Sequence, residues 1–347
     1  MKNWMIYGAN GYTASLIARE AKAKGLKPIL AGRNREACEA LAKELELPVR
    51  IFNCSKSTEM VEHLKDVSLV LHCAGPFSKT SRPMIDACLQ TKTSYLDITG
   101  EISVFEDIHQ RNEEIRAAGI VAMPGVGFDV VPTDCLALML KEKMPDAVKL
   151  SLGFKSPGTL SPGTAKTMIE GLGESGAVRK NGVIIEVPPA YGVRKIRFDR
   201  SQRPAMTIPW GDVSTAFYST GIPDIAVYMA ASESAIRFTK LSGKLKSILA
   251  TGIVQSLLKK LAGKFVVGPG LEMRSSRQTI VWGEVENAKG DKYELRLTTP
   301  ESYQLTVYTA LNAAERVLNG GISAGATTPS QAFGSSFILT FPGVQLS

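Results

Sequence analysis

The chain has 347 residues, of which 44% are hydrophobic and 21% are charged. This composition is typical of a globular protein, and the length is sufficient for two domains with separate cores. The net charge of +8 comes from basic residues that are scattered along the sequence, so composition gives nucleic-acid binding little support. No uncharged run is long and uninterrupted enough to cross a membrane as a helix, and the first residues leave no room for a signal-peptide core.

The cysteines and histidines argue against a metal protein. Five cysteines stand at wide spacings without a C-x-x-C pair, and three histidines show no ligand spacing. We therefore expect a reduced, cytoplasmic protein without a metal and without disulfides.

Over the first 130 residues, short apolar runs alternate with amphipathic helical patterns. Helices are predicted over 11–24, from 34 to about 46, and over 102–119. The β-like runs are 5–8, 28–32, 49–52, 67–74, 94–98 and 120–125. Because strands that alternate with helices need right-handed crossovers, residues 1–130 are predicted to form a Rossmann-type, doubly wound parallel α/β sheet.

The pattern changes after about residue 150, where prolines and glycines cluster at 155–166. The runs that alternate like half-buried antiparallel strands are 195–199, 279–286 and 292–299. Residues 131–299 are therefore predicted to form a second, α+β substrate domain. A helical pattern at 301–318 has apolar residues along one side, and we expect the segment 300–347 to pack back onto the first domain.

The first predicted strand runs into Gly8-Ala-Asn-Gly11-Tyr-Thr-Ala14, a G-x-x-G-x-x-A pattern at the start of a helix. Gly8 permits a tight turn, Gly11 lets the backbone approach a pyrophosphate, and the small Ala14 lets the helix lie close to the sheet. The amide groups at the start of the helix then face the diphosphate. The pattern predicts a dinucleotide-binding turn.

Arg33 follows the second predicted strand, about 20 residues after the glycines. An NAD-specific site carries an acidic residue there for the ribose 2′-hydroxyl, whereas a guanidinium suits a 2′-phosphate. We therefore predict NADP(H) as the cofactor. A solvated arginine in an ordinary turn is the alternative.

The fourth predicted strand ends in His72-Cys73-Ala74-Gly75-Pro76-Phe77. Ligands of open α/β sheets bind beyond the carboxyl ends of the strands, so the turn 73–77 can run along the cofactor with Phe77 on its nicotinamide side. An ordinary βα turn is the alternative.

Carboxylates follow the fifth and sixth predicted strands, near the same edge of the sheet. A partly buried carboxyl group there can have a raised pKa and act as an acid. The candidates for a catalytic role are Asp97, Glu101 and Asp129. Asp134 falls in the first turn of a helix after Pro132, where a carboxylate complements the helix dipole.

Tyr191 and Lys195 match the Y-x-x-x-K spacing of short-chain dehydrogenases. That chemistry needs both side chains on one helix face, and Gly192 with the preceding prolines predicts a loop or strand instead. We treat the match as a coincidence.

Residues 237–264 contain seven basic residues and no acidic ones, with apolar residues at helical spacing between 245 and 261. A basic amphipathic helix of this kind can lie on a membrane interface or cover a tunnel for an acyl chain. Packing of its apolar stripe into the core is the alternative.

Taken together, the motifs resemble those of the saccharopine dehydrogenase-like oxidoreductases. The motifs are GANGYTA (8–14), AGR (31–33), HCAGPF (72–77), YLDITGE (95–101) and PGVGFDVVPTD (124–134). Three further segments resemble the branch of trans-acting enoyl reductases and animal saccharopine dehydrogenase-like oxidoreductases more than the saccharopine-forming enzymes. These are SPGTAKTMIEGL (161–172), PWGDVSTAFYSTGIPDI (209–225) and TPSQAFG (328–334).

The resemblance implies a Rossmann domain that holds NADPH and a substrate domain folded over its nicotinamide end. By motif match, the cofactor residues are Gly8, Asn10, Gly11, Tyr12, Thr13, Arg33, Cys73, Ala74, Gly75, Pro76 and Phe77. Ala14 replaces a third glycine, which we consider harmless. The third strand ends in Asn53-Cys54-Ser55, where such proteins often place an aspartate beside the adenine, so recognition of the adenine is left open.

The expected function is reduction of an enoyl or related double bond in a lipid-like or polyketide-type acyl substrate, with NADPH. One alternative is a saccharopine-type imine reductase or amino-acid dehydrogenase. Its substrate carries several carboxylates, for which the second domain offers Arg179, Arg194, Arg197, Arg200 and Arg203. The other alternative is a non-catalytic lipid-surface protein with a structural dinucleotide. Peripheral membrane contact through 237–264 and a homodimer are left open as partners.

Overall fold

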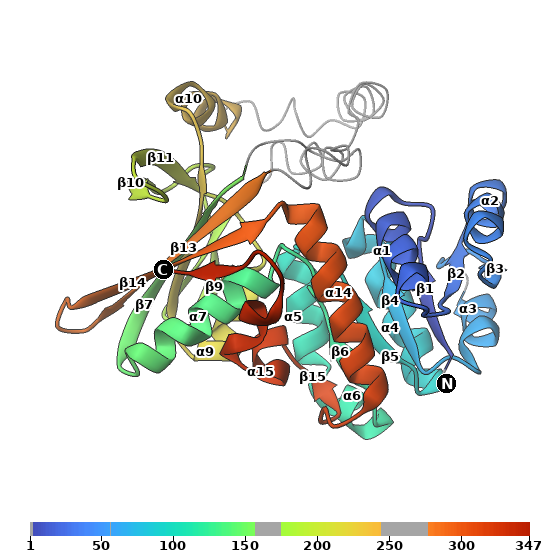
Figure 1. Ribbon diagram of the computed structural model, residues 1–347. Coiled ribbons are helices and arrows are strands. Elements are labelled where there is room, and N and C mark those ends of the chain that lie inside the picture. The colour runs from blue at the N-terminus through green and yellow to red at the C-terminus, as the bar shows by residue number, and fades with distance from the viewer. Residues whose placement is uncertain (1–2, 56, 157–174, 244–276) are drawn as a thin grey trace. The chain divides into compact units, whose positions relative to one another are not determined.

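The computed structural model describes residues 3–55, 57–156, 175–243 and 277–347 (Figure 1). Contacts divide the chain into unit 1, Met1–Val131 with Tyr303–Gly334, and unit 2, Pro132–Ser302 with Ser335–Ser347. The sequence pattern itself changes further along the chain, after about residue 150. The last 13 residues, 335–347, group with unit 2, whereas we expected them with the first domain.

Unit 1 is built on a parallel sheet in the order β15-β6-β5-β4-β1-β2-β3. Its strands are β1 (Trp4–Tyr7), β2 (Ile29–Gly32), β3 (Val49–Ile51), β4 (Leu69–His72), β5 (Ser94–Asp97), β6 (Val121–Met123) and β15 (Gly325–Ala326). The central strand β1 is buried along its whole length, as its apolar sequence requires. The register places Tyr7, His72 and Asp97 side by side at the carboxyl ends of three neighbouring strands.

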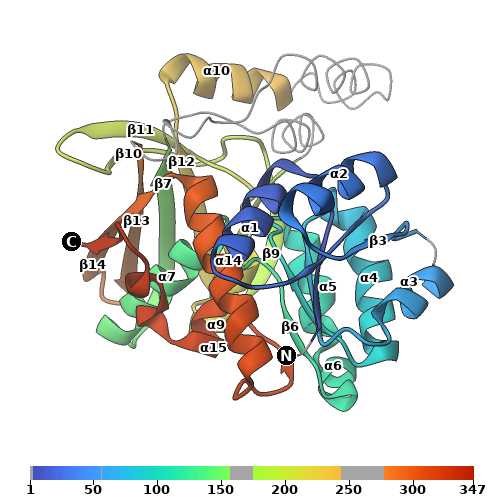
Figure 2. The same cartoon turned by 45° about the vertical axis from the view of Figure 1, so that its right-hand side comes forward.

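Helices cover both faces of this sheet, and each face has its own apolar core (Figure 2). One face packs against α1 (Tyr12–Ala23), α2 (Arg35–Leu45) and α14 (Ser302–Asn319). The other packs against α3 (Ser57–Leu64), α4 (Phe77–Thr91), α5 (Ile102–Gln110) and α6 (Asn112–Ala118). The predicted doubly wound α/β fold is confirmed, and the helix expected over 102–119 is divided at Arg111 into α5 and α6.

Unit 2 has a nine-stranded mixed sheet with the order β10-β11-β12-β7-β13-β14-β16, and β8 and β9 branch from β12. Its strands are β7 (Ala147–Lys155), β8 (Gly176–Lys180), β9 (Val183–Val187), β10 (Val193–Arg197), β11 (Gln202–Thr207), β12 (Asp224–Ala230), β13 (Gln278–Asn287), β14 (Lys292–Pro300) and β16 (Gln345–Leu346). The antiparallel pairing expected of the alternating runs is confirmed, although β7 and β12 run parallel.

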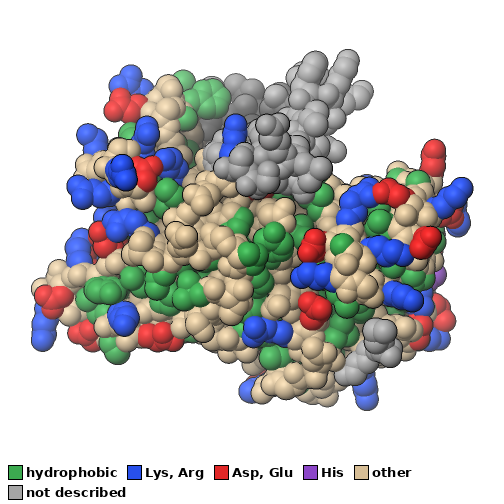
Figure 3. Space-filling model, in the orientation of Figure 1, with side chains coloured by type: hydrophobic (Ala, Val, Ile, Leu, Met, Phe, Trp, Pro, Cys, Tyr) green, Lys and Arg blue, Asp and Glu red, His purple; other side chains and the backbone are tan. Residues whose placement is uncertain are grey.

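The helices of unit 2 are α7 (Val131–Lys143), α9 (Asp212–Thr220) and α10 (Glu233–Ser242), followed near the chain end by the 3₁₀ helix η2 (Ser335–Thr340). The short helix α15 (Pro329–Phe333) belongs to unit 1. Gly283 of β13 lets α7 approach closely, because a Cβ there would lie 2.6 Å from Leu140 Cδ1. Basic side chains gather over the part of the surface formed by β10, β11 and α10 (Figure 3).

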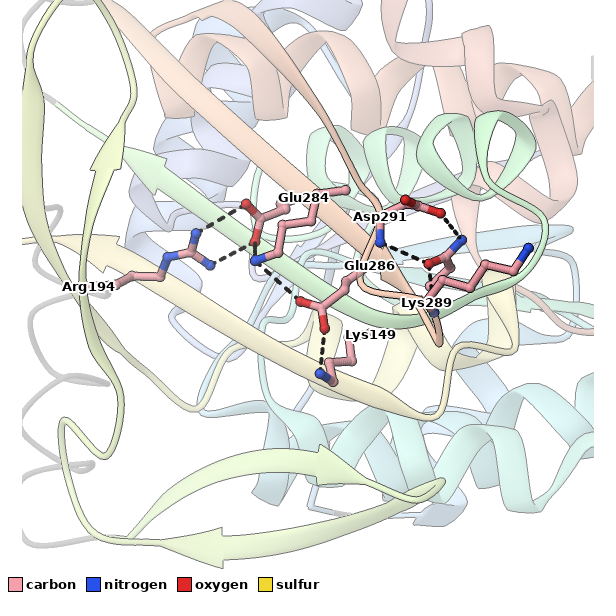
Figure 4. Close-up of polar contacts among 8 residues, drawn as sticks. Lys149, Arg194, Glu284, Glu286, Lys289 and Asp291 are labelled. Carbon is pink, nitrogen blue, oxygen red and sulfur yellow. Dashed lines mark hydrogen bonds and ion pairs between the residues drawn. The ribbon is translucent and has the colours of Figure 1, made fainter.

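A ladder of alternating charges crosses the sheet of unit 2 (Figure 4). Arg194 binds Glu284 with both guanidinium nitrogens at 3.0 and 3.2 Å, and Lys292 bridges Glu284 to Glu286 at 3.6 and 3.3 Å. Lys149 completes the row at 2.6 Å from Glu286. The two lysines hold the pKa of Glu286 below its usual range. Since the side chains of Lys149 and Lys292 are more than half exposed, their ion pairs contribute little to stability.

Tyr191 precedes β10 and Lys195 lies within it, so the Y-x-x-x-K match is on extended chain, as predicted. The cluster at 155–166 lies outside the described residues except for its first two positions, and so does 244–264 of the predicted basic helix.

Candidate functional site

The turn between β1 and α1 has glycine at two positions where neighbouring atoms leave little room for a Cβ. Gly8 has a φ of 82°, and a Cβ there would lie 2.9 Å from Ala74 Cβ and 3.0 Å from Ala74 N. A Cβ on Gly11 would lie 3.1 Å from Gly8 O. The amides of Gly8 and Ala9 both donate to Ala31 O, at 2.7 and 2.9 Å, which ties the turn to β2.

Helix α1 begins at this turn without a side-chain cap and without an acidic residue in its first turn. Its N-terminal amides are thus the natural donors for an anion, and the helix dipole favours negative charge there. Ala14 is buried in the core of the sheet, as expected of a small residue at the third position of the motif. These residues fit the diphosphate of a dinucleotide.

The other residues of the motif connect the turn to its neighbours. Asn10 Oδ1 lies 3.6 Å from the Sγ of Cys38 in α2. The ring of Tyr12 packs edge-on against Tyr303 of α14, with 5.1 Å between centroids, and Thr13 is half-buried in the first turn of α1. These contacts join the turn to α2 and the first turn of α1 to α14.

Arg33 is exposed directly after β2, and no ion pair to it is found among the described residues. The next residue, Asn34, caps α2 by accepting from Ala37 N at 3.1 Å, and Arg35 pairs with Glu39 at 2.8 Å. Of the two arginines in this turn, Arg33 is therefore the one with an available guanidinium. That is the arrangement required for a 2′-phosphate.

The phenol of Tyr7, at the end of β1, holds the backbone that follows β3. Its hydroxyl donates to Phe52 O at 3.2 Å and accepts from Cys54 N at 2.9 Å. This link fixes the backbone of 52–54 against β1. No local sequence pattern predicts this link, because it joins residues that are 45 and 47 positions apart.

The turn after β4, which runs from Cys73 to Phe77 through a cis Gly75–Pro76 bond, is fixed by side chains at both ends. The hydroxyl of Thr80 lies 2.6 Å from Ala74 O and 3.1 Å from Pro76 O, so it can donate to either carbonyl. The carboxylate of Glu101 accepts from Phe77 N at 2.8 Å and from Ser78 N at 2.7 Å. The turn therefore has a fixed shape independent of any ligand.

The buried side chain of His72 contacts two residues that hold or form this turn, Thr80 and Phe77. Its Nε2 lies 2.9 Å from Thr80 Oγ1, and its ring stacks on Tyr7 and meets Phe77 edge-on, both at 5.5 Å between centroids. Burial lowers the pKa of His72 to about 3, so the imidazole is neutral. Because the Thr80 hydroxyl already donates to a carbonyl, Nε2 carries the proton in this arrangement.

The three candidate acids have different surroundings. Asp97 is fully buried and accepts from Tyr95 Oη at 2.7 Å, Thr99 N at 3.0 Å and Gly125 N at 2.8 Å. Burial outweighs these hydrogen bonds and raises its pKa to about 6. Glu101 is committed to the amides of α4. Both carboxylates thus connect segments of the site.

Asp129, on the segment between β6 and α7, differs from both. It is half-buried, no hydrogen bond or ion pair to its carboxylate is found in the described part of the chain, and burial raises its pKa to about 7. A Cβ on Gly100 would lie 2.8 Å from Asp129 Oδ2, so the glycine makes room for this carboxyl group. Asp129 thus has a higher pKa than Asp97, and of the three carboxylates it is the one to which no hydrogen bond is found in the described part of the chain.

Asp134 lies in the first turn of α7, as predicted, and belongs to unit 2. Its carboxylate accepts a hydrogen bond from the hydroxyl of Ser219 at 2.6 Å and is fully buried.

No group of His, Cys, Asp and Glu side chains among the described residues could hold a metal ion. None of the helices in this part of the chain has the length and apolar character needed to span a bilayer.

Comparison with known proteins agrees with this geometry. Residues 4–123 match the family described as the saccharopine dehydrogenase NADP-binding domain. A saccharopine dehydrogenase-like oxidoreductase of Mus musculus is 28% identical over 202 residues, which are 51% of this chain and 47% of the mouse protein. A trans-acting enoyl reductase of Mycobacterium leprae is 29% identical over 140 residues, or 38% of this chain and 33% of that protein. The chain thus spans about half the length, or less, of these relatives.

Solved structures show the same fold at low identity. Apo saccharopine dehydrogenase (L-Glu forming) of Saccharomyces cerevisiae has a TM-score of 0.68 and 13% identity, covering 100% of this chain and 99% of that one. A homospermidine synthase of Legionella pneumophila, solved with NAD, has a TM-score of 0.65 and 10% identity, covering 100% of this chain and 91% of that one. The resemblance inferred from the motifs is confirmed: residues 4–123 match the saccharopine dehydrogenase NADP-binding domain, and about half of the chain is similar to saccharopine dehydrogenase-like oxidoreductases.

Proposed function

We propose that the chain is an NADPH-dependent reductase of a carbon–carbon double bond conjugated to the carbonyl of a lipid-like or polyketide-type acyl substrate. The observation that carries the proposal is Asp129, a carboxyl group with a pKa of about 7 and no partner among the described residues, on the segment that follows β6. The similarity to the M. leprae trans-acting enoyl reductase supports the choice of an enoyl substrate.

The residues of unit 1 divide the work of binding the cofactor. Gly8 and Gly11 leave the backbone bare at the start of α1 for the diphosphate, and Arg33 holds the 2′-phosphate. The turn 73–77, fixed by Thr80 and Glu101, lines the nicotinamide side. When bound, the cofactor supplies the hydride for the β-carbon of the double bond.

Asp129 holds the second hydrogen that the reduction needs. Near neutral pH the Asp129 carboxyl group is protonated in a substantial fraction of the protein molecules. This proton is available for the α-carbon or the carbonyl oxygen of the substrate. In this proposal Asp97 and Glu101 are positioning residues, because their oxygens already accept hydrogen bonds from neighbouring segments.

Imine reduction of the saccharopine type is the second candidate. It needs cations for the substrate carboxylates, but two of the five arginines are engaged inside unit 2. Arg179 is buried and donates to Val213 O at 2.8 Å and Gly182 O at 2.7 Å, and Arg194 is paired with Glu284. The exposed Arg197, Arg200 and Arg203 remain, so this candidate is kept as the comparison in the test.

Oxidation of NADPH with a series of enoyl thioesters, compared with lysine plus 2-oxoglutarate, tests the proposal. We expect turnover with enoyl thioesters and a large loss of kcat in Asp129→Asn, with NADPH affinity unchanged. Glu113→Gln on the exposed face of α6 is the matched control. Turnover with lysine plus 2-oxoglutarate alone, or full activity of Asp129→Asn, would contradict it.

A further inference from the structure

Helix α10 carries apolar side chains on two faces. One face packs against the sheet of unit 2, and the other is exposed to solvent. Ile236 is buried and contacts Ala190 and Met206 in a small core beneath the helix. Phe238 and Leu241 lie two and five residues further on, which at about 100° per residue places them on the opposite side. They are 66% and 54% exposed.

The hairpin of β10 and β11 continues this surface. Val193 pairs with Met206, which packs on α10, so the alternating residues Val193, Lys195 and Arg197 lie on the same face of the hairpin as the helix. Val193 is 45% exposed, and Tyr191 just before it is 56% exposed. Apolar and basic side chains therefore alternate on one continuous face.

The end of α10 and the loop before β10 are in direct contact. A Cβ on Gly243 would lie 3.1 Å from Pro189 Cδ, and Tyr191 and Lys240 line one open hollow together with Glu186. Helix and hairpin thus form a single surface, which we call the α10 face: Tyr191, Val193, Lys195, Arg197, Arg237, Phe238, Lys240 and Leu241.

The charge of the α10 face is positive. Lys195, Arg197 and Lys240 are exposed, and no ion pair to them is found in the part of the chain that the structure describes. The acidic neighbours are largely compensated. Asp199 pairs with Lys155 and Glu233 lies 4.0 Å from Arg237, while Glu186 at the rim of the hollow is exposed.

We propose that the α10 face docks the protein on a membrane surface that contains anionic phospholipids. Phe238 and Leu241 enter the boundary between head groups and acyl chains, and the surrounding lysines and arginines bind the lipid phosphates. A symmetric second copy fits poorly, because the same positive surface would face itself. A nucleic acid would use the rings of Tyr191 and Phe238 but would leave the aliphatic Leu241 and Val193 in water, so a membrane accounts for more of the face. This inference does not depend on the proposed reductase activity.

Flotation of the full-length chain with phospholipid vesicles tests it. With phosphatidylcholine vesicles that also contain phosphatidylserine, we expect the protein to float and to be released by salt. With phosphatidylcholine alone, it should remain at the bottom. The variant Phe238→Ser/Leu241→Ser should bind at least about tenfold more weakly, because burial of two large apolar side chains is lost. Lys195→Glu/Arg197→Glu should lose at least about tenfold as well, from the reversal of two charges near the surface.

Matched control variants distinguish binding through the α10 face from non-specific adsorption to the vesicles. Leu339→Ser/Leu346→Ser removes two leucines that are 39% and 44% exposed elsewhere, and Lys27→Glu/Lys43→Glu reverses two exposed lysines of unit 1. Both control variants should float like the wild type, and circular dichroism should show all variants folded. Equal flotation with both kinds of vesicle, or wild-type flotation of Phe238→Ser/Leu241→Ser, would overturn the proposal. A change in sedimentation velocity of that variant without a change in flotation would assign the face to self-association instead, which also overturns it.

Discussion

Gly8 gives the sharpest structural prediction, because the chain contains a glycine that serves as its control. Gly8 and Gly25 have nearly the same backbone conformation, with φ of 82° and 75°. A Cβ on Gly8 meets Ala74 N at 3.0 Å and Ala74 Cβ at 2.9 Å, whereas nothing lies within 4 Å of a Cβ on Gly25. The two Gly→Ala variants therefore share the backbone strain and differ in the contact with Ala74.

The strain of an alanine in the left-handed region costs about 1–2 kcal/mol. Overpacking against backbone atoms, which cannot swing away, adds about 1–3 kcal/mol at Gly8. We therefore expect Gly25→Ala to lower the free energy of unfolding by about 1–2 kcal/mol and Gly8→Ala by about 2–5 kcal/mol. The displaced turn of Gly8→Ala should also bind NADPH at least about tenfold more weakly, since the amides at the start of α1 would shift.

Urea unfolding gives the stability difference, and amide hydrogen exchange of peptides from β1 and β4 shows whether the loss is located in unit 1. NADPH fluorescence gives the affinity. Equal destabilisation by the two variants would refute the close packing of Gly8 on Ala74. Unchanged NADPH affinity in Gly8→Ala would refute the assignment of this turn to the diphosphate.

Two further predictions concern the carboxylates. Because the pKa of Asp129 is raised to about 7 from an ordinary value of 3.8, the folded state binds more protons than the unfolded state between these values, so the free energy of unfolding should fall as pH rises from about 4 towards 7. Asp129→Asn should reduce this slope, leaving the part that comes from Asp97, whose pKa is raised to about 6, and in the wild type kcat should fall above pH 7. An unchanged slope in the variant would contradict the raised pKa of Asp129. Glu101→Gln presents an NH₂ group to one of the two amides of α4, so it should lower the free energy of unfolding by about 1–2 kcal/mol and weaken NADPH binding, as measured by urea unfolding and fluorescence. The exposed Glu113→Gln should change neither quantity, and a Glu101→Gln variant that behaves like it would contradict the clamp on the turn.

Local sequence patterns were sufficient for the dinucleotide-binding sheet. A buried strand followed by Gly8 and Gly11 and an amphipathic helix has few other structures available to it, and the position of Arg33 follows from the same unit. The division of 102–119 into α5 and α6 was not predicted, because its apolar pattern continues through Arg111.

The roles of the carboxylates could not be predicted, because they depend on partners distant in sequence. Glu101 binds amides 23 and 24 residues away, and Asp97 binds Gly125 N, 28 residues away. In the sequence, these residues and Asp129 all look like acids beyond the end of a strand. Only the fold distinguishes a carboxylate that joins two segments from one that has no partner among the described residues.

We place the cofactor at the edge where β1 and β2 end, with its 2′-phosphate on Arg33. Titration of the wild type and of Arg33→Ala with NADPH and NADH, followed by nicotinamide fluorescence, tests this most directly. We expect the wild type to bind NADPH more tightly than NADH by at least about tenfold, and Arg33→Ala to lose that preference while its NADH affinity is unchanged. Equal losses for both cofactors would contradict the phosphate contact, and no binding of either cofactor by the wild type would contradict the account as a whole.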